Sequence, residues 1–167
     1  MGMSEWVWAL VRWVHLVAMA IWLGGQLFLF LVVRPVLRSQ LDRPTQTQLT
    51  AAFGRRYSPL AWISLIVAIL TGFAIGEHRG VAWSALVSFP SAYGTLLIMK
   101  MTLVALILVL TLLHGRFIGP QLTELARSLD PRDRQRYRQL LDLSVLISTA
   151  NLLLTLLIVL LSARLVA

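Results

Sequence analysis

The chain has 167 residues, of which 58% are hydrophobic and 13% charged; its formal net charge is +8 and its mean hydropathy +0.79. About a quarter of the residues of a soluble domain are charged, so this chain has too few polar side chains to face water all round. It contains no cysteine, which excludes disulfides, thiolate metal ligands and cysteine nucleophiles. Composition therefore predicts an all-α integral membrane protein, and the length suits a single domain, residues 1–167.

Four apolar stretches are each long enough to cross about 30 Å of hydrocarbon, which takes roughly 20 helical residues. In chain order they cover residues 6–33, 57–76, 91–115 and 140–165. The leader before the first stretch is acidic and the stretch itself is long, so we expect this helix to be retained rather than cleaved as a signal peptide. No internal repeat is evident. We predict one antiparallel bundle of four transmembrane helices.

The arginines predict the orientation of the bundle. Of the 15 cationic residues, 11 lie in two segments, residues 34–56 and 116–138. Loops rich in Arg and Lys stay in the cytoplasm, so both segments are predicted to be cytoplasmic loops and both termini to lie outside. This clustering accounts for the net charge without a nucleic-acid partner. We expect a multi-pass protein of a bacterial-type inner (plasma) membrane, with the lipid bilayer as its main partner.

Local patterns add detail at the helix ends. Trp6, Trp8 and Trp83 are expected to form an aromatic belt at the outer surface. Before the last helix, Asp130 is a candidate N-cap and Pro131 suits the first helical position.

Small and polar residues follow helical spacing in the second and fourth spans. Gly72 and Gly76 form a small-xxx-small pair, which lets a neighbouring backbone approach closely. In the fourth span, polar residues spaced four, three and four apart predict one stripe that faces the interior: Ser144, Ser148, Asn151 and Thr155.

Lys100 is the residue at membrane depth that most needs a partner. It is the only lysine of the chain and lies about nine residues, or about 14 Å, inside the third span. A lysine at a helix centre costs about 2.5 to 3.5 kcal/mol to insert. His15 lies at nearly the same depth in the first span, which runs in the same direction, so the two residues are predicted to face each other. They either serve as hydrogen-bonding residues or bind a metal or cofactor, the lysine as a neutral amine.

His114 and Asn151 are further candidates. His114 lies fourteen residues after Lys100 on nearly the same face, but about 21 Å further toward the cytoplasm. It therefore cannot share one metal with Lys100, and either binds a second cofactor or caps the helix end. Asn151 lies near mid-membrane and either donates to a cofactor or to Lys100, or joins neighbouring helices.

Several motifs resemble one known family. The first span contains RWVHL from Arg12, WLGG from Trp22 and the dipeptide RP at Arg34. The third contains YGTLLIMK, which ends at Lys100, and HGRFIGP, which begins at His114; the fourth contains NLL. Together these motifs, which extend over most of the chain, resemble the membrane domain of the copper-resistance protein D (CopD) family.

A more distant similarity is to the HemJ-type protoporphyrinogen oxidases, small membrane proteins with a histidine in the first helix and a lysine in a later one, both implicated in binding haem b. His15 and Lys100 occupy the corresponding positions, so the resemblance implies that these two residues bind haem b. After the histidine the chain reads WLGGQLFLFLVVRP, which is closer to CopD.

A haem b needs an apolar slot, axial nitrogen ligands and a route for its propionates. Under this interpretation Trp22 is a cofactor-binding residue, and Gly24 and Gly25, which have no side chains, allow close approach to the macrocycle. Arg12, one turn before His15, either meets a propionate or reaches the lipid headgroups.

Three functions are consistent with the sequence. The first is a haem-b-binding redox protein that passes electrons to a protein partner or oxidises a small substrate, so enzymatic activity is left open. The second is a copper-handling protein, with His15, Met19 and either Met99 or Met101 as soft ligands, although the last two point about 200° apart on a helix. The third is a cofactor-free subunit of a larger membrane complex; homo-oligomerisation is also left open.

Overall fold

The computed structural model describes residues 3–80, 92–126, 128, 130 and 132–166. These residues contain no strand and form four long helices: α1 (Met3–Phe28), α3 (Arg43–His78), α4 (Ala92–Leu113) and α6 (Asp133–Val166). Shorter elements continue α1 and α4: η1 (Leu29–Val33) with α2 (Arg34–Gln40), and η3 (His114–Ile118) with α5 (Gly119–Leu125). The predicted all-α, four-helix class is confirmed. Trp83 of the expected aromatic belt and Pro131 before the last helix lie outside the described residues.

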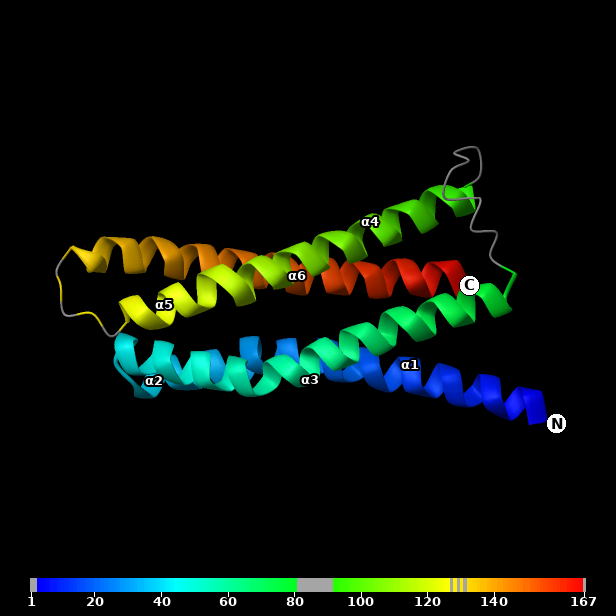
Figure 1. The fold of residues 1–167 in the computed structure, drawn as a ribbon, viewed down its shortest axis with the longest axis horizontal. Helices are drawn as coiled ribbons and strands as arrows, with labels where there is room; N and C mark the ends of the chain where they lie inside the picture. Colours follow the sequence, from blue (N-terminus) through cyan, green and yellow to red (C-terminus); the bar gives the residue numbers. More distant parts are fainter. Residues whose placement is uncertain (1–2, 81–91, 127, 129, 131, 167) are drawn as a thin grey trace.

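The long helices form two antiparallel hairpins (Figure 1). Helix α1 packs against α3, and α4 packs against α6; α6 also contacts α1, and α5 contacts α3. Both ends of the chain lie at one end of the bundle, which we call the terminus end, and α2 and α5 lie at the other, the α2/α5 end (Figure 1). The arginine-rich segments therefore share one end of the molecule.

The outward faces of the long helices are apolar. Large aliphatic side chains such as Leu16, Leu70 and Leu146 are about two-thirds exposed, at 66%, 64% and 65%. Four helical stretches are long and apolar enough to cross a membrane: Met3–Gln40, Arg43–His78, Thr95–Leu125 and Asp133–Arg164. A water-soluble protein does not expose apolar surface over whole helices. The chain is therefore an integral membrane protein whose outer surface contacts lipid.

The segments predicted as loops, residues 34–56 and 116–138, are largely helical. Helix α3 has 36 residues, so it is about 54 Å long and exceeds the hydrocarbon thickness of about 30 Å. The sequence between residues 45 and 56 contains no proline, and Pro44 lies in the first turn, where its missing N–H breaks no helical bond. Asp42 caps this helix by accepting from Thr45 N at 3.3 Å, and hydrogen bonds from Thr45 lower the pKa of its carboxyl below the usual value.

A π-helical turn interrupts the first arm of each hairpin directly before a proline. The N–H groups of Arg34 and Gly119 donate to the carbonyl five residues back instead of four. The next residue, Pro35 or Pro120, has no N–H, and its ring clashes with the carbonyl four residues back. The turn widens to relieve the clash, and the helix then continues.

The two arms are structural repeats of each other, which corrects the view that no repeat is present. The two proline sites lie 85 residues apart, and the same spacing relates buried residues of the two arms. Trp22 and Ile107, for example, are both 3% exposed, and Val33 and Ile118 are both buried. Because the arms run in the same direction, residues related by this spacing lie at equal height in the bundle.

An apolar layer at mid-height joins the two hairpins. It consists of buried residues from all four long helices: Trp22, Ala61, Leu65, Ile107 and Ile158. In lipid, helices associate through close packing and not through exclusion of water. This layer is therefore the main contact that sets the distance between the hairpins.

Tyr57 fastens α3 to α1. Its hydroxyl lies 2.9 Å from the carbonyl of Ile21 and 3.0 Å from that of Trp22, to which it donates. Its ring covers Gly25, where an added Cβ would lie 2.2 Å from the ring. Beside Gly24, by contrast, no atom lies within 4 Å of an added Cβ.

We expect Gly25→Ala to destabilise the protein relative to Gly24→Ala. Both substitutions gain similar helix propensity, but only the first forces the Tyr57 ring to move, at a cost of about 1 to 3 kcal/mol. Thermal unfolding of the detergent-solubilised variants measures the difference. Equal melting temperatures for the two variants would show that the Tyr57 contact does not constrain the hairpin.

Candidate cofactor site

His15 is hydrogen-bonded to the second helix of its own hairpin. Its Nδ1 lies 2.9 Å from the hydroxyl oxygen of Thr71. The single hydroxyl proton of Thr71 is donated within α3, to the carbonyl of Val67 at 2.6 Å. With the proton placed there, the Thr71 oxygen accepts from His15, and we infer that Nδ1 carries the imidazole proton. Nε2 is left with a free lone pair, and no hydrogen bond to it is found among the described residues.

Gly72 makes room for the imidazole. A Cβ at this position would lie 3.3 Å from His15 Cε1. The sequence pattern predicted that Gly72 lets a neighbouring helix backbone approach closely. In the structure the group that lies closest to it is the His15 imidazole. Thr71 and Gly72 together therefore position one edge of His15 against α3.

Lys100 lies on α4, in the other hairpin, close enough to His15 for their charges to interact. It is half-buried, and within the described part of the chain it has no hydrogen-bond or ion-pair partner. The two residues occupy equivalent positions of the repeat. His15 lies 19 residues before Arg34 and Lys100 lies 19 residues before Gly119, the residues that directly precede the two prolines. His15 and Lys100 therefore lie at corresponding positions of the two hairpins.

Two of the expected cofactor neighbours have other roles. Trp22 lies in the central apolar layer, seven residues or about 10 Å along α1 from His15. Gly25 does not offer an open surface to a macrocycle, because the Tyr57 ring fills the space beside it. Both residues take part in helix packing, about two turns or more along α1 from His15.

Asn151 and His114 lie nearer the α2/α5 end. Asn151 Nδ2 donates to Thr111 Oγ1 at 3.2 Å, so the amide joins α6 to α4 and does not contact Lys100. His114 begins η3, and its Nδ1 is buried without a hydrogen-bond partner. The predicted inward stripe on α6 is confirmed by the burial of Ser144 and Thr155, which are 6% and 1% exposed.

Arg12 lies in the first arm at the terminus end and is exposed. It lines an open cavity of about 350 Å³ together with Ser4, Glu5, Trp8, Ala9 and His78. The rings of Trp8 and His78 stack there at 3.8 Å, which holds the end of α3 against the start of α1.

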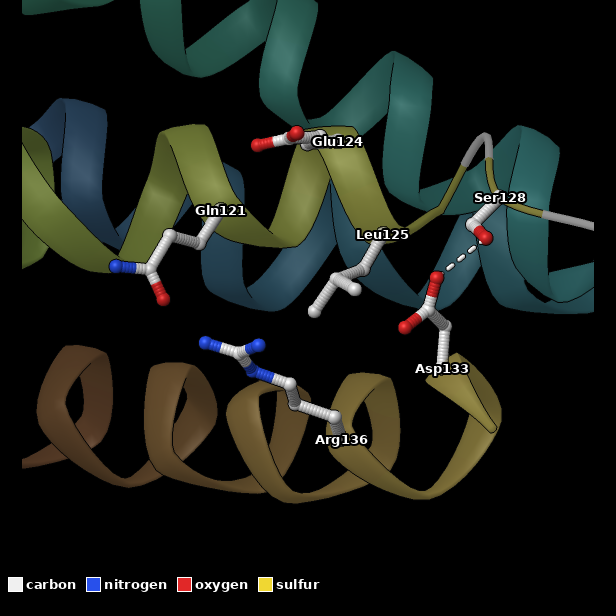
Figure 2. A pocket seen from close by; sticks show the side chains of 6 residues that line it. All are labelled: Gln121, Glu124, Leu125, Ser128, Asp133 and Arg136. Carbon is white, nitrogen blue, oxygen red and sulfur yellow. Dashed lines mark hydrogen bonds between the residues drawn. The ribbon is translucent and has the colours of Figure 1, made fainter. Parts of the chain in front are cut away.

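A second cavity, of about 470 Å³, opens at the α2/α5 end between α5 and α6 (Figure 2). Figure 2 shows the six residues that line it: Gln121, Glu124, Leu125, Ser128, Asp133 and Arg136. The Ser128 hydroxyl donates to the carboxylate of Asp133 at 2.5 Å, a bond that closes the turn into α6. Two acidic residues and one basic residue line this cavity, and none of the predicted site residues lies in it.

The metal chemistry available inside the bundle is limited. Among the described residues, no group of three or more His, Asp or Glu side chains lies close enough together to hold a metal ion. A site at His15 must therefore use Lys100, methionine or a cofactor's own atoms to complete the ligand set.

The family model of copper resistance protein D (CopD) matches residues 51–161. The chain belongs to the CopD family. The match extends from the first half of α3 almost to the end of α6, so it includes Lys100, His114 and Asn151 but not His15. Comparisons with curated proteins and with solved structures find no match.

The sequence interpretation missed the residues that position His15. Thr71 was one of few hydroxyl side chains in the second span, and that rarity was the available signal. The equal spacing of His15 and Lys100 from the two prolines was also visible in the sequence, but it becomes meaningful only once both arms are known to kink at the proline.

The Thr71 contact predicts a single histidine tautomer. In the wild-type protein, the ¹⁵N shifts of His15 should correspond to a protonated Nδ1 and a free Nε2. Thr71→Val removes the acceptor and should yield a mixture of tautomers, whereas Thr71→Ser keeps the acceptor and the wild-type spectrum. An unchanged spectrum in Thr71→Val would show that another group orients the ring.

Proposed function

We propose that this CopD-family protein is a membrane redox protein in which His15 and Lys100 would hold one haem b between the two hairpins. The observation that carries the proposal is the pairing of two unused nitrogen ligands at one height. His15 keeps Nε2 free because Thr71 engages Nδ1, and Lys100 has no partner among the described residues.

The two-hairpin arrangement is suited to a flat cofactor. α1 and α4 belong to different hairpins, so ligands from them approach a group between them from opposite sides. Polar groups in lipid that lack partners are costly, and iron coordination satisfies both nitrogens. The lysine amine binds iron only as the neutral base. Haem b supplies a one-electron carrier when it is bound.

The residues around the site have defined roles under this proposal. Thr71 and Gly72 orient the imidazole of His15, and Arg12, one turn nearer the terminus end, pairs with a propionate. The central apolar layer closes the site on the α2/α5 side. Electrons would therefore be exchanged with a partner at the terminus end.

Copper handling is the second candidate, because the family is described as copper resistance protein D. His15 Nε2 with the thioether of Met19, one turn along α1, offers soft donors for Cu(I). Copper needs no slot between the hairpins, and Lys100 would then be a neighbouring cation and not a ligand.

Substitutions of the two nitrogens test the haem proposal. His15→Ala should abolish haem retention, and Lys100→Met should keep haem with an altered absorption spectrum, because a thioether replaces the amine. Lys100→Arg should lose the native spectrum, because guanidinium stays protonated and cannot bind iron. The control His78→Ala, at an exposed histidine outside the site, should retain the wild-type pigment.

The same preparations separate the two candidates. Haem gives a Soret band with reducible α and β bands, whereas copper gives colourless protein with metal that is lost in His15→Ala. A Lys100→Arg variant with an unchanged spectrum and midpoint potential would contradict the lysine ligand. Protein that contains neither haem nor copper would exclude both functions and favour a structural subunit.

The proposal also includes the orientation: an inner-membrane protein with its α2/α5 end in the cytoplasm, supported by the 11 arginines of residues 34–56 and 116–138. Reporters inserted at Thr47 or Asp130 should behave as cytoplasmic, and a reporter fused after Ala167 as periplasmic. A cytoplasmic C-terminal reporter would contradict this orientation.

A further inference from the structure

Five polar residues lie near the α2/α5 end of the bundle, four of them in two hydrogen-bonded pairs. Arg34 Nη2 donates to Ser148 Oγ at 3.4 Å, and Asn151, one turn along α6, donates to Thr111 at 3.2 Å. His114 follows Thr111 by one turn and lies close enough to Arg34 for their charges to interact. We call Arg34, Thr111, His114, Ser148 and Asn151 the polar cluster.

The polar cluster contains more hydrogen-bonding capacity than its members use. Buried without a partner in the described structure are His114 Nδ1, Asn151 Oδ1 and, about 12 Å along the first arm from Arg34, Gln26 Nε2. Buried polar atoms are nearly always paired, so several unpaired ones in a small region indicate an absent polar ligand. The oxygen and the NH2 group of the Asn151 amide can exchange positions by rotation of the side chain. The NH2 group would then be the one without a partner, as a free donor.

The π-helical turn brings Gln26 to the same side of the first arm as Arg34. Eight residues separate them, but η1 adds one residue to its turn. The rotation therefore equals that of about seven residues in a regular α-helix, or nearly two full turns. Gln26 is thus directed to the face that carries Arg34, on the side nearer the central apolar layer.

Arg34 supplies a permanent positive charge that no carboxylate balances. It is half-buried, and the contacts described for it are the Ser148 hydroxyl and the Phe30 ring, 5.7 Å from the guanidinium carbon. No ion pair between Arg34 and a carboxylate is found in the described parts of the chain. A partly buried cation with unused N–H groups, next to an unpaired imidazole nitrogen, is suited to an anion with several acceptor oxygens.

We propose that the polar cluster binds a phosphate-type oxyanion, with Arg34 as the charged partner and His114 and the Asn151 amide as further donors. The anion is either free phosphate or the headgroup of a lipid with net negative charge, such as phosphatidylglycerol. This site is separate from the one at His15: nineteen residues, or about 28 Å, separate Arg34 from His15 along the first arm, and the central apolar layer lies between them. It is therefore independent of the proposed haem or copper function.

Titration of the full-length protein with inorganic phosphate, in detergent without anionic lipid, tests the site. Wild type should bind phosphate, and Arg34→Gln should bind at least about tenfold more weakly, because it removes a charge-assisted hydrogen bond. Arg38→Gln, at an exposed arginine one turn further on, should bind as wild type does. No phosphate binding by wild type, together with no retained anionic lipid, would overturn the proposal, as would equal binding by both variants.

The source of the anion is distinguished in lipid nanodiscs. If a headgroup is the ligand, discs containing phosphatidylglycerol should abolish the binding of added phosphate, whereas discs of phosphatidylcholine alone should preserve it. Native mass spectrometry should then detect phosphatidylglycerol retained by wild type and by Arg38→Gln, but not by Arg34→Gln. Phosphate binding that is unaffected by phosphatidylglycerol identifies free phosphate as the ligand.

A built-in carboxylate gives a test that does not depend on removing the arginine. Ser148→Asp places an anionic oxygen beside Arg34, so it should raise the melting temperature in phosphate-free buffer and eliminate phosphate binding. Ser148→Asn, of similar size and neutral, should do neither. A lower melting temperature for Ser148→Asp than for Ser148→Asn would show that the polar cluster does not favour an anion.

Discussion

Polar groups inside this bundle must find partners within the chain, because the surrounding lipid offers none. This constraint determines most of the contacts that define the molecule. Thr71 uses its proton on its own helix and its oxygen on His15, and Tyr57 reaches across to two carbonyls of α1. The contact between Thr71 and His15 and the bonds from Tyr57 join α1 to α3. The requirement that satisfies these polar atoms therefore also holds the first hairpin together. Lys100 and the Nδ1 atom of His114 lack such partners among the described residues, and both belong to sites that we propose above.

Proline determines the shape of the first arm of each hairpin, which is α1 to α2 in one and α4 to α5 in the other. Pro35 and Pro120 cannot make the regular helical hydrogen bond, so each forces a wider turn directly before it. The 85 residues that separate the two prolines also separate Trp22 from Ile107, which are both buried. The repeat gives the proposed haem site its symmetry, since ligands at equal height on two parallel arms can approach a flat group from both sides. It also re-aims the residues at the turn itself, so that a guanidinium on one arm and an imidazole on the other are directed toward α6.

Along its length the bundle contains three layers with different chemistry. The layer of His15, Thr71 and Lys100 lies toward the terminus end, the apolar layer around Trp22 lies at mid-height, and the polar cluster lies toward the α2/α5 end. An apolar layer without unpaired polar atoms resists the passage of water and protons. The apolar layer therefore separates the proposed haem site from the proposed anion site. The CopD family match includes Lys100 and Thr71 of the first layer but not His15. The role proposed for His15 is therefore supported by its contacts and not by the match.

Hydropathy and charge alone determined the class, the number of spans, the shared side of the two arginine-rich segments and the depth of His15 and Lys100, because these depend on position along a helix of fixed rise. The inward stripe on α6 followed from helical periodicity for the same reason. The sequence did not reveal which neighbour each glycine admits: Gly25 accommodates Tyr57 and Gly72 accommodates His15, where a macrocycle and a backbone were expected. Nor did it reveal the tautomer of His15 or the closure of the polar cluster. Those depend on contacts between residues far apart in the chain, and only the packing of the two hairpins decides which side chains meet.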